Sequence, residues 1–188
     1  MNLRLAIMDD LPKIKMMYQR ITENMNKNNI QIWDNIYPCE FLGEDIKHGQ
    51  LYVIENNHDI VASFALCPSH LGENYVQWTG HHDKVLYIDR LGVNVDYLRQ
   101  GIGSLAIKKA LFLARQNDIQ YIRLFVVDIN QPAIQLYLKN GFKRVEGIYD
   151  EVIDDGFVLH EYGFEMKVEN YKGEGEDNNE FITSSRNL

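Results

Sequence analysis

Apolar residues recur along this chain at two spacings, which predict alternating strands and helices. In residues 14–21 and 101–117 they recur every three or four positions, as on one face of an amphipathic helix. Residues 121–127 are almost continuously apolar, which is typical of a central strand buried on both faces. In residues 85–95 the alternation of apolar positions changes phase between Ile88 and Leu91. An extra residue there predicts a β-bulge, which also separates a strand from its neighbour.

The remaining segments complete the order of one mixed α/β domain. Further strands are predicted at residues 2–7, 51–55, 60–66, 142–149 and 156–168, and further helices after Asp10 and at residues 38–48 and 131–140. The acidic residues 150–155 are predicted to form a turn. We therefore expect a single domain over residues 1–168, with a twisted, mixed sheet of about seven strands and helices on both faces. Residues 169–188 are rich in Glu, Asn, Gly and Ser, which predicts a flexible acidic tail.

Composition and charge narrow the classes of function. Of the 188 residues, 45% are hydrophobic and 24% charged, as in ordinary soluble domains. The net charge of -8 argues against a general nucleic-acid binder, which needs Lys and Arg to neutralise phosphates. Asp9 and Asp10 interrupt any apolar leader, and no run of about 18 apolar residues follows. We therefore predict a cytoplasmic protein that does not enter the membrane.

The cysteines and histidines do not predict a metal or disulfide site. Cys39 and Cys67 lack the C-x-x-C spacing, so free and partly buried thiols are expected. His81 and His82 are adjacent, would point to opposite faces of a strand, and have no evident third ligand. A polar loop is favoured there, and no metal cofactor is expected.

A glycine turn, Arg99-Gln100-Gly101-Ile102-Gly103-Ser104, opens the helix predicted at residues 101–117. The first N–H groups of a helix have no partner inside it and carry partial positive charge, so they suit a phosphate. Gly101 and Gly103 would let the backbone approach such a group closely, and Arg99 and Ser104 would add charge and a hydroxyl donor. The turn therefore predicts a phosphate-binding site.

Two other interpretations of the turn stay open. A turn that needs glycine only for its backbone dihedrals explains the same letters. Ala106 would also complete a permitted variant of the dinucleotide fingerprint G-x-G-x-x-G. That fingerprint normally lies in the first strand–helix unit, whereas this turn lies in mid-chain, so the dinucleotide interpretation is disfavoured.

A second block, Asn130-Gln131-Pro132-Ala133-Ile134-Gln135-Leu136-Tyr137, opens the next helix and is followed by Gly141-Phe142. Asn130 is a favoured N-cap, and Pro132 fits the first turn of a helix. Ala133 and Tyr137 are four residues apart and share a helix face. Taken alone, a tyrosine at this position is more often a packing residue with its hydroxyl at the surface.

The two blocks together, about thirty residues apart, resemble the GNAT superfamily of acetyl-CoA-dependent N-acetyltransferases. The resemblance is strong over residues 85–145 and covers roughly residues 2–167. Leu98 stands where the family has Arg or Gln, three residues before Gly101, which leaves open the side chain that touches the pyrophosphate. The resemblance implies acetyl-CoA as cosubstrate, bound by residues of the strand, the turn and the second helix. These are Leu91, Gly92, Val93, Arg99, Gln100, Gly101, Ile102, Gly103, Ser104, Asn130, Ala133 and Tyr137.

The resemblance also implies catalytic roles. Tyr137 matches the tyrosine proposed to protonate the departing thiolate, and the Val93 N–H matches the oxyanion donor. Asp89 matches a strand position where many relatives carry a glutamate general base, although a structural pair with Arg90 explains it equally well. Alternatives for the base are His82, Glu73 or a water chain. Trp33, Tyr37 and Phe41 match the region that lines the acceptor side, and simple packing is as good an explanation.

The resemblance thus implies acetyl transfer to a primary amine, by direct attack in a ternary complex. The acceptor would be a small-molecule or peptide amine. A non-catalytic acyl-CoA-binding sensor of the same fold is one alternative, and a different nucleotide-binding enzyme is another. The sequence leaves the acceptor unidentified and a homodimer open.

Overall fold

The computed structural model describes residues 1–34, 36–80, 84–154 and 156–170. Its helices are α1 (Leu11–Lys27), α2 (Leu42–Lys47), α3 (Ile102–Gln116) and α4 (Gln131–Lys139), with single-turn 3-10 helices η1 (Met8–Asp10), η2 (Leu71–Asn74), η3 (Val95–Tyr97) and η4 (Val168–Asn170). Its strands are β1 (Asn2–Leu5), β2 (Leu51–Asn56), β3 (Asp59–Cys67), β4 (Val76–Gln77), β5 (Val85–Val93), β6 (Tyr121–Val127), β7 (Lys143–Arg144), β8 (Glu146–Gly147), β9 (Tyr149–Asp154) and β10 (Phe157–Lys167).

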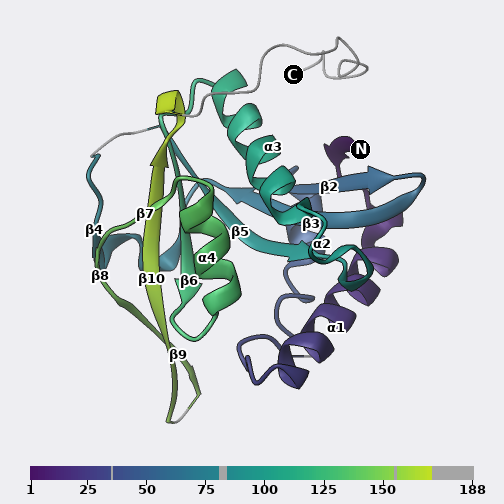
Figure 1. Cartoon of the computed structure of the whole chain (residues 1–188), viewed down its shortest axis with the longest axis horizontal. Helices are drawn as coiled ribbons and strands as arrows, with labels where there is room; N and C mark the ends of the chain where they lie inside the picture. The colour runs from purple at the N-terminus through teal and green to yellow at the C-terminus, as the bar shows by residue number, and fades with distance from the viewer. Residues whose placement is uncertain (35, 81–83, 155, 171–188) are drawn as a thin grey trace.

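One mixed sheet organises the domain (Figure 1). Within the described residues it has eight strands in the order β1-β2-β3-β5-β6-β10-β7, with β9 paired to β10, and β4 and β8 form a separate ladder. The β5–β6 pair is parallel, and the other strand pairs of the described residues are antiparallel. The predicted mixed α/β fold is therefore confirmed.

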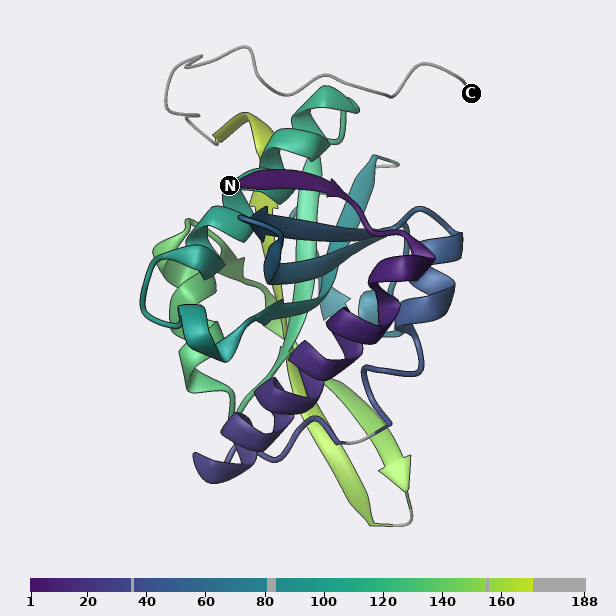
Figure 2. The ribbon, with the colours of Figure 1, turned by 90° about the vertical axis from the view of Figure 1, so that its right-hand side faces the viewer.

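The C-terminal part of the chain is divided more finely than predicted. Residues 142–149, expected as one strand, contain β7, β8 and the start of β9. Residues 150–154, expected as part of an acidic turn, pair with β10. The acids are compatible with a strand because the β9–β10 hairpin extends beyond the rest of the sheet (Figure 2), where one of its faces meets solvent.

Strand β5 carries the predicted bulge and separates from β6. Ser63 pairs with Gly92 and Ala65 pairs with Asp89, so β5 has one more residue than β3 between these pairs. Arg90 lies in the bulge with a φ of 50°. Pairing with β6 covers only Val85–Tyr87, and beyond it no strand among the described residues pairs with that edge of β5. The sequence prediction of a bulge and parted strands is confirmed.

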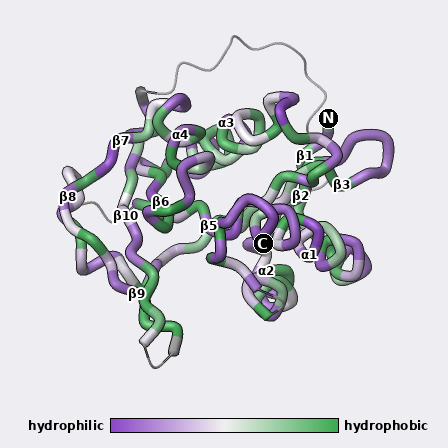
Figure 3. The backbone as a smooth tube through the Cα atoms, turned by 60° about the horizontal axis from the view of Figure 1, so that its bottom comes forward, coloured by the Kyte–Doolittle hydropathy of each residue, from purple (hydrophilic) through white to green (hydrophobic). Residues whose placement is uncertain are grey.

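Two hydrophobic cores lie on opposite faces of the sheet. Helices α3 and α4 cover one face and α1 and α2 cover the other (Figures 1 and 2). Before the bulge Tyr87 packs in the core under α1, whereas after it Leu91 and Val93 pack toward α3. The bulge therefore shifts the alternation of β5, so that its odd-numbered side chains face α1 before the bulge and α3 after it. Figure 3 shows the hydrophobic residues concentrated on the strands and on the inward sides of the helices.

Several details differ from the sequence predictions. Helix α1 continues through its polar end to Lys27, and α2 begins at Leu42 instead of residue 38. Leu138, an apolar residue at helical spacing from Ile134, is 46% exposed because it lies on the outer side of the short helix α4. Cys39 and Cys67 are free and buried, as predicted. Of the predicted tail, residues 169–170 belong to η4, and residues 171–188 lie outside the described part.

Candidate active site

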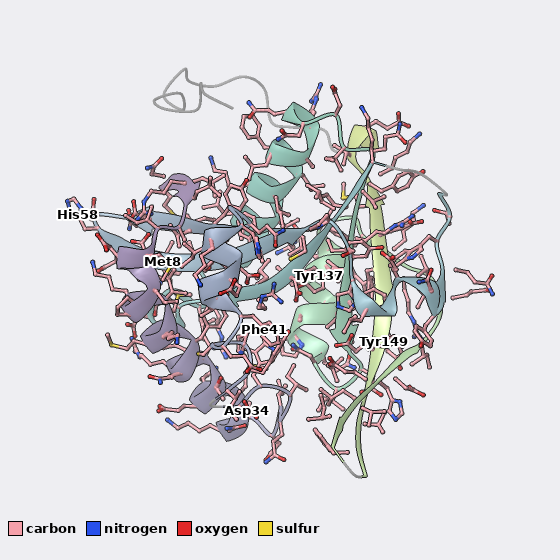
Figure 4. All side chains as sticks on the ribbon, turned by 180° about the vertical axis from the view of Figure 1, so that it is seen from behind. Met8, Asp34, Phe41, His58, Tyr137 and Tyr149 are labelled. Atoms are coloured by element: carbon pink, nitrogen blue, oxygen red, sulfur yellow. The ribbon has the colours of Figure 1, made fainter. Side chains whose placement is uncertain are left out.

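A cleft of about 1380 Å³ opens where β5 and β6 part. Its walls come from the segment between α1 and α2, the second half of β5, the start of α4 and the β9–β10 hairpin. Most of the predicted site residues line it, namely Trp33, Tyr37, Asp89, Leu91, Gly92, Val93, Arg99, Asn130, Ala133 and Tyr137. Figure 4 shows Tyr137 and Phe41, a further member of the lining, near the centre of the molecule. The cleft therefore brings together residues that are a hundred positions apart.

The glycine turn lies beyond the lining of this cleft. Gln100, Gly101, Ile102, Gly103 and Ser104 do not border it, and the neighbouring Arg99 does. Gly101 is exposed with a φ of 80°, a conformation that favours glycine, and a Cβ built there would meet no atom within 4 Å. The N-terminus of α3 therefore has open space in front of its first N–H groups.

Gly103 and Ser104 have structural contacts of their own. A Cβ at Gly103 would come within 2.9 Å of Leu136 Cδ2, so glycine there lets α3 approach α4. The Ser104 hydroxyl accepts a hydrogen bond from the Asn140 side-chain amide at 3.0 Å. Each of these residues therefore joins the glycine turn to the helix that carries Tyr137.

Gly92 shows that α1 supports the wall of the cleft. A Cβ at Gly92 would lie 2.8 Å from the ring of Tyr18. Tyr18 is fully buried, and its hydroxyl donates to the Arg90 carbonyl in the bulge. Helix α1 thus packs directly on the backbone of β5 and holds the bulge in place.

Tyr137 is positioned by the capping of α4. The Asn130 side chain accepts a hydrogen bond from the Ala133 N–H at 3.3 Å, as the sequence predicted. One face of the Tyr137 ring packs near Phe142 and Phe164, and only 7% of the residue is exposed. Burial, aided by the negative charge of Asp89, raises the pKa of the Tyr137 hydroxyl above its ordinary value. The hydroxyl is therefore protonated at neutral pH and has a proton to donate.

Asp89 lines the cleft, but its carboxylate is already engaged. One oxygen accepts from the Arg90 backbone N–H at 2.8 Å, and the other lies 2.6 Å from the Arg90 guanidinium. The same guanidinium binds Asp45 of α2 through two contacts of 2.8 and 2.9 Å. Arg90 thus pairs with two acids at once, and its ring contact with Phe41, at 5.7 Å, shields it further.

Two glutamates of the β9–β10 hairpin complete the cleft, and sequence reasoning missed both. Glu151 and Glu161 line the same cavity as Asp89. Burial, the charge of Glu151 and the charge of Asp89 together raise the pKa of Glu161 to about 8. Burial likewise raises the pKa of Glu151. One feature of the sequence could have identified Glu161. It is an acid at alternate spacing from Leu159 and Gly163, which share its strand face and are both buried.

The other candidates for a base are placed differently. Glu73 does not line the cleft, and its carboxylate accepts from the Tyr87 hydroxyl at 3.3 Å. His81 and His82 lie outside the described residues. Within residues 1–34, 36–80, 84–154 and 156–170, no group of three or more His, Cys, Asp or Glu side chains is arranged to hold a metal ion. No helix in these ranges has the length and hydropathy needed to cross a membrane.

Trp33 and Tyr37 belong to a row of aromatic rings along the acceptor side of the cleft. The Trp33 ring lies 5.6 Å from Tyr18 and 6.4 Å from Tyr37, and Tyr37 lies 5.6 Å from Phe41. The row connects the buried end of α1 to α2. It therefore packs the wall and lines the cavity at once, and the acceptor-side role of Trp33 and Tyr37 stays a prediction.

A comparison with protein families decides the relationship. The profile of the acetyltransferase (GNAT) family matches residues 15–142, which is more than half of the chain. The chain belongs to the GNAT acetyltransferase family. The match extends from α1 through the bulge, the glycine turn and Tyr137, and ends at Phe142. The recognition made from the sequence motifs is therefore confirmed.

Curated relatives and solved structures agree with this assignment. The chain is 38% identical over 67 residues to a thialysine N-epsilon-acetyltransferase from Sus scrofa, an alignment of 36% of this chain and 38% of that protein. A Staphylococcus aureus Mu50 protein classed as an acetyltransferase has a TM-score of 0.67 at 21% identity, over 88% of this chain and 98% of the other. The protein yncA from Salmonella typhimurium, whose structure includes its cofactor acetyl-CoA, has a TM-score of 0.61 at 15% identity, over 94% and 98%. At these identities the structural matches establish the fold.

Proposed function

We propose that this protein transfers an acetyl group from acetyl-CoA to a primary amine, by direct attack in a ternary complex. The observation that carries the proposal is the cleft between the parted strands β5 and β6. It extends from Arg99, beside the glycine turn, to the buried Tyr137. A family relationship supports the same reaction class.

The residues present fit acetyl-CoA. The open space at Gly101 leaves room for a diphosphate before the first N–H groups of α3, and Arg99 adds a positive charge beside it. The unpaired edge of β5, with Leu91, Gly92 and Val93, offers backbone groups to the pantetheine arm as a neighbouring strand would. Asn130 and Ala133 would border the same arm at the start of α4.

Each side chain then has a defined chemical task. Acetyl-CoA supplies the thioester. The Val93 N–H would donate to the carbonyl oxygen as negative charge develops on it. Tyr137 would give its proton to the sulfur as the C–S bond breaks, and would regain a proton from the nitrogen as the C–N bond forms. The raised pKa of Tyr137 keeps its hydroxyl protonated at neutral pH, so a proton is present there to be donated.

The acceptor would approach from the other face of the sheet. Tyr137 packs on Phe164, whereas Glu161 and Leu159 belong to the opposite face of β10. Trp33, Tyr37 and the hairpin glutamates line that approach, which suits an aliphatic amine carrying positive charge. The thialysine N-epsilon-acetyltransferase relatives act on an amine of this description, and this also supports the proposal.

A thiol-release assay with acetyl-CoA over a panel of primary amines tests the function. We expect turnover by the wild type, and a loss of roughly 10²–10⁴-fold in kcat for Tyr137→Phe, with the affinity for coenzyme A nearly unchanged in calorimetry. Tyr75→Phe is the matched control, since Tyr75 is 64% exposed and does not border the cleft. Coenzyme A binding without turnover of any amine would instead favour an acyl-CoA sensor.

A further inference from the structure

We propose that Glu161, on the last long strand, is the general base that takes the proton from the amine acceptor. This inference rests on the proposed acetyl transfer and assigns its missing proton acceptor. Asp89, at the strand position where the family resemblance places the base, then acts through its charge and through Arg90.

Glu161 is placed for this task by the hairpin. It pairs with Tyr149 of β9 and lies opposite Val127 of β6 on the other side. Its side chain belongs to the face of β10 that borders the cleft, between the buried Leu159 and Gly163. It therefore meets the acceptor side of the opening between β5 and β6.

One oxygen of the Glu161 carboxylate has no hydrogen-bond partner among the described residues. This oxygen is Oε2, and it is buried. A buried and unsatisfied acceptor is costly unless a ligand or a proton completes it. Asp89 differs on this point, because both of its oxygens contact Arg90.

The charges around Glu161 favour its protonated form. The titratable groups that face it are Glu151 and Tyr149 of β9, Asp89 and Arg90 of β5, and Tyr37 of the segment before α2. Its partner in β6 is the apolar Val127. Arg90 is the one cation in this group, and it is bound to Asp45 and Asp89. Burial followed by the charges of Glu151 and Asp89 places the pKa of Glu161 near 8, which suits a base that works close to neutral pH.

The proton balance of the reaction follows. A protonated amine gives one proton to Glu161, which frees the nitrogen lone pair for attack on the thioester carbon. As the C–N bond forms and the C–S bond breaks, the sulfur takes the Tyr137 proton, and the nitrogen returns its second proton to Tyr137. Glu161 then releases its proton to water. One N–H⁺ proton per acetyl group is thus lost to solvent, as the overall reaction requires.

Steady-state kinetics of Glu161→Gln and Asp89→Asn separate the two acids. We expect Glu161→Gln to lower kcat by roughly 10²–10⁴-fold and to abolish the acid limb of the pH profile of kcat/KM, with coenzyme A affinity unchanged in calorimetry. Glu146→Gln is the matched control, because Glu146 is an exposed strand glutamate outside the cleft. Asp89→Asn should retain an acid limb, moved to lower pH.

Glu151→Gln tests whether Glu161 acts as a base or has only a structural role, because a structural role would not produce a pH shift. Removing the Glu151 charge should shift the acid limb of kcat/KM to lower pH, because that charge raises the pKa of Glu161. If the acid limb of the Glu151→Gln enzyme does not move, the assignment of Glu161 as the base is wrong.

Three further outcomes would also overturn it. They are a Glu161→Gln enzyme with wild-type kcat, an Asp89→Asn enzyme that alone loses the acid limb, and a Glu161→Gln defect confined to KM. These failures leave wild-type turnover intact. An absence of thiol release by the wild type is different, because it would remove the proposed function together with the base.

Discussion

Asp89 and Glu161 face one cleft from two different strands, and they have opposite surroundings. Asp89 lies beside a bulge whose arginine is turned inward, so both of its oxygens are paired before any ligand arrives. Glu161 lies in a regular strand, near two other acids, with a buried oxygen left without a partner in the described structure. The comparison teaches that a strand position predicts where an acid lies, whereas its neighbours decide whether it is available for chemistry.

The two regions also differ in what keeps them in shape. The Asp89 region is fixed from outside the cleft by Asp45 of α2 and by the Tyr18 hydroxyl of α1. The Glu161 region is held by pairing of β9 with β10 and by the aromatic packing of Tyr149 against Phe125, at 6.1 Å. Changes that disturb the first region should therefore appear in stability, and changes in the second should appear in catalysis.

Arg90→Ala would break the comparison most strongly. It leaves Asp45 and Asp89 without their shared cation, and removing one partner of a buried ion pair typically costs about 3–5 kcal/mol. Urea unfolding at pH 7 measures the loss. Arg20→Ala is the matched control, because Arg20 and Asp96 form an exposed pair and its removal should leave the midpoint almost unchanged. Equal midpoints for the two variants would contradict the role of Arg90 in pairing with the two acids.

The pH dependence of the free energy of unfolding tests the surroundings of Glu161. Its pKa is about 8 in the folded protein, against 4.5 for an unperturbed glutamate, so between these values the unfolded chain holds fewer protons than the folded one. The free energy of unfolding should therefore fall as the pH rises through this window, with a contribution on the order of 4 kcal/mol from Glu161.

Glu161→Gln isolates this contribution, since glutamine does not ionise. We expect the variant to exceed the wild type in stability at pH 8 and to approach it near pH 5, in denaturant titrations at both pH values. A difference that does not change with pH would show that Glu161 ionises normally in the folded state.

Arg90→Lys is expected to have the smallest effect of the three. Lysine keeps the positive charge but has no planar fork to bind Asp45 through two nitrogens while reaching Asp89. A loss of roughly 2 kcal/mol in urea unfolding is expected, about one charge-assisted hydrogen bond. Stability equal to that of the wild type would mean that charge alone holds this part of the cleft.

Sequence alone predicted the elements whose pattern is local. The alternation shift between Ile88 and Leu91 located the bulge, and the two motifs located the starts of α3 and α4. Asn130 and Pro132 were correctly interpreted as capping residues, because capping depends on a few adjacent positions. The family recognition rests on the same local signals.

The chemistry of the acids was not predictable in this way. That Arg90 binds Asp45 depends on a contact across 45 residues, and the surroundings of Glu161 depend on how β9 folds back on β10. Glu151 was assigned to a turn because acidic residues are uncommon in strands, and its pairing with Leu159 overrides that preference. Long-range packing thus determines which carboxylate is free, and composition carries little information about it.

The contact between Gly103 and Leu136 has a consequence for engineering this protein. The two sequence blocks are about thirty residues apart, yet a single methyl group at position 103 would push against the helix that carries Tyr137. Chimeras that import one block from a homologue should misalign the ends of the cleft unless they import the other as well. Transplanting both as one cassette is therefore the conservative way to exchange cofactor preference in this scaffold.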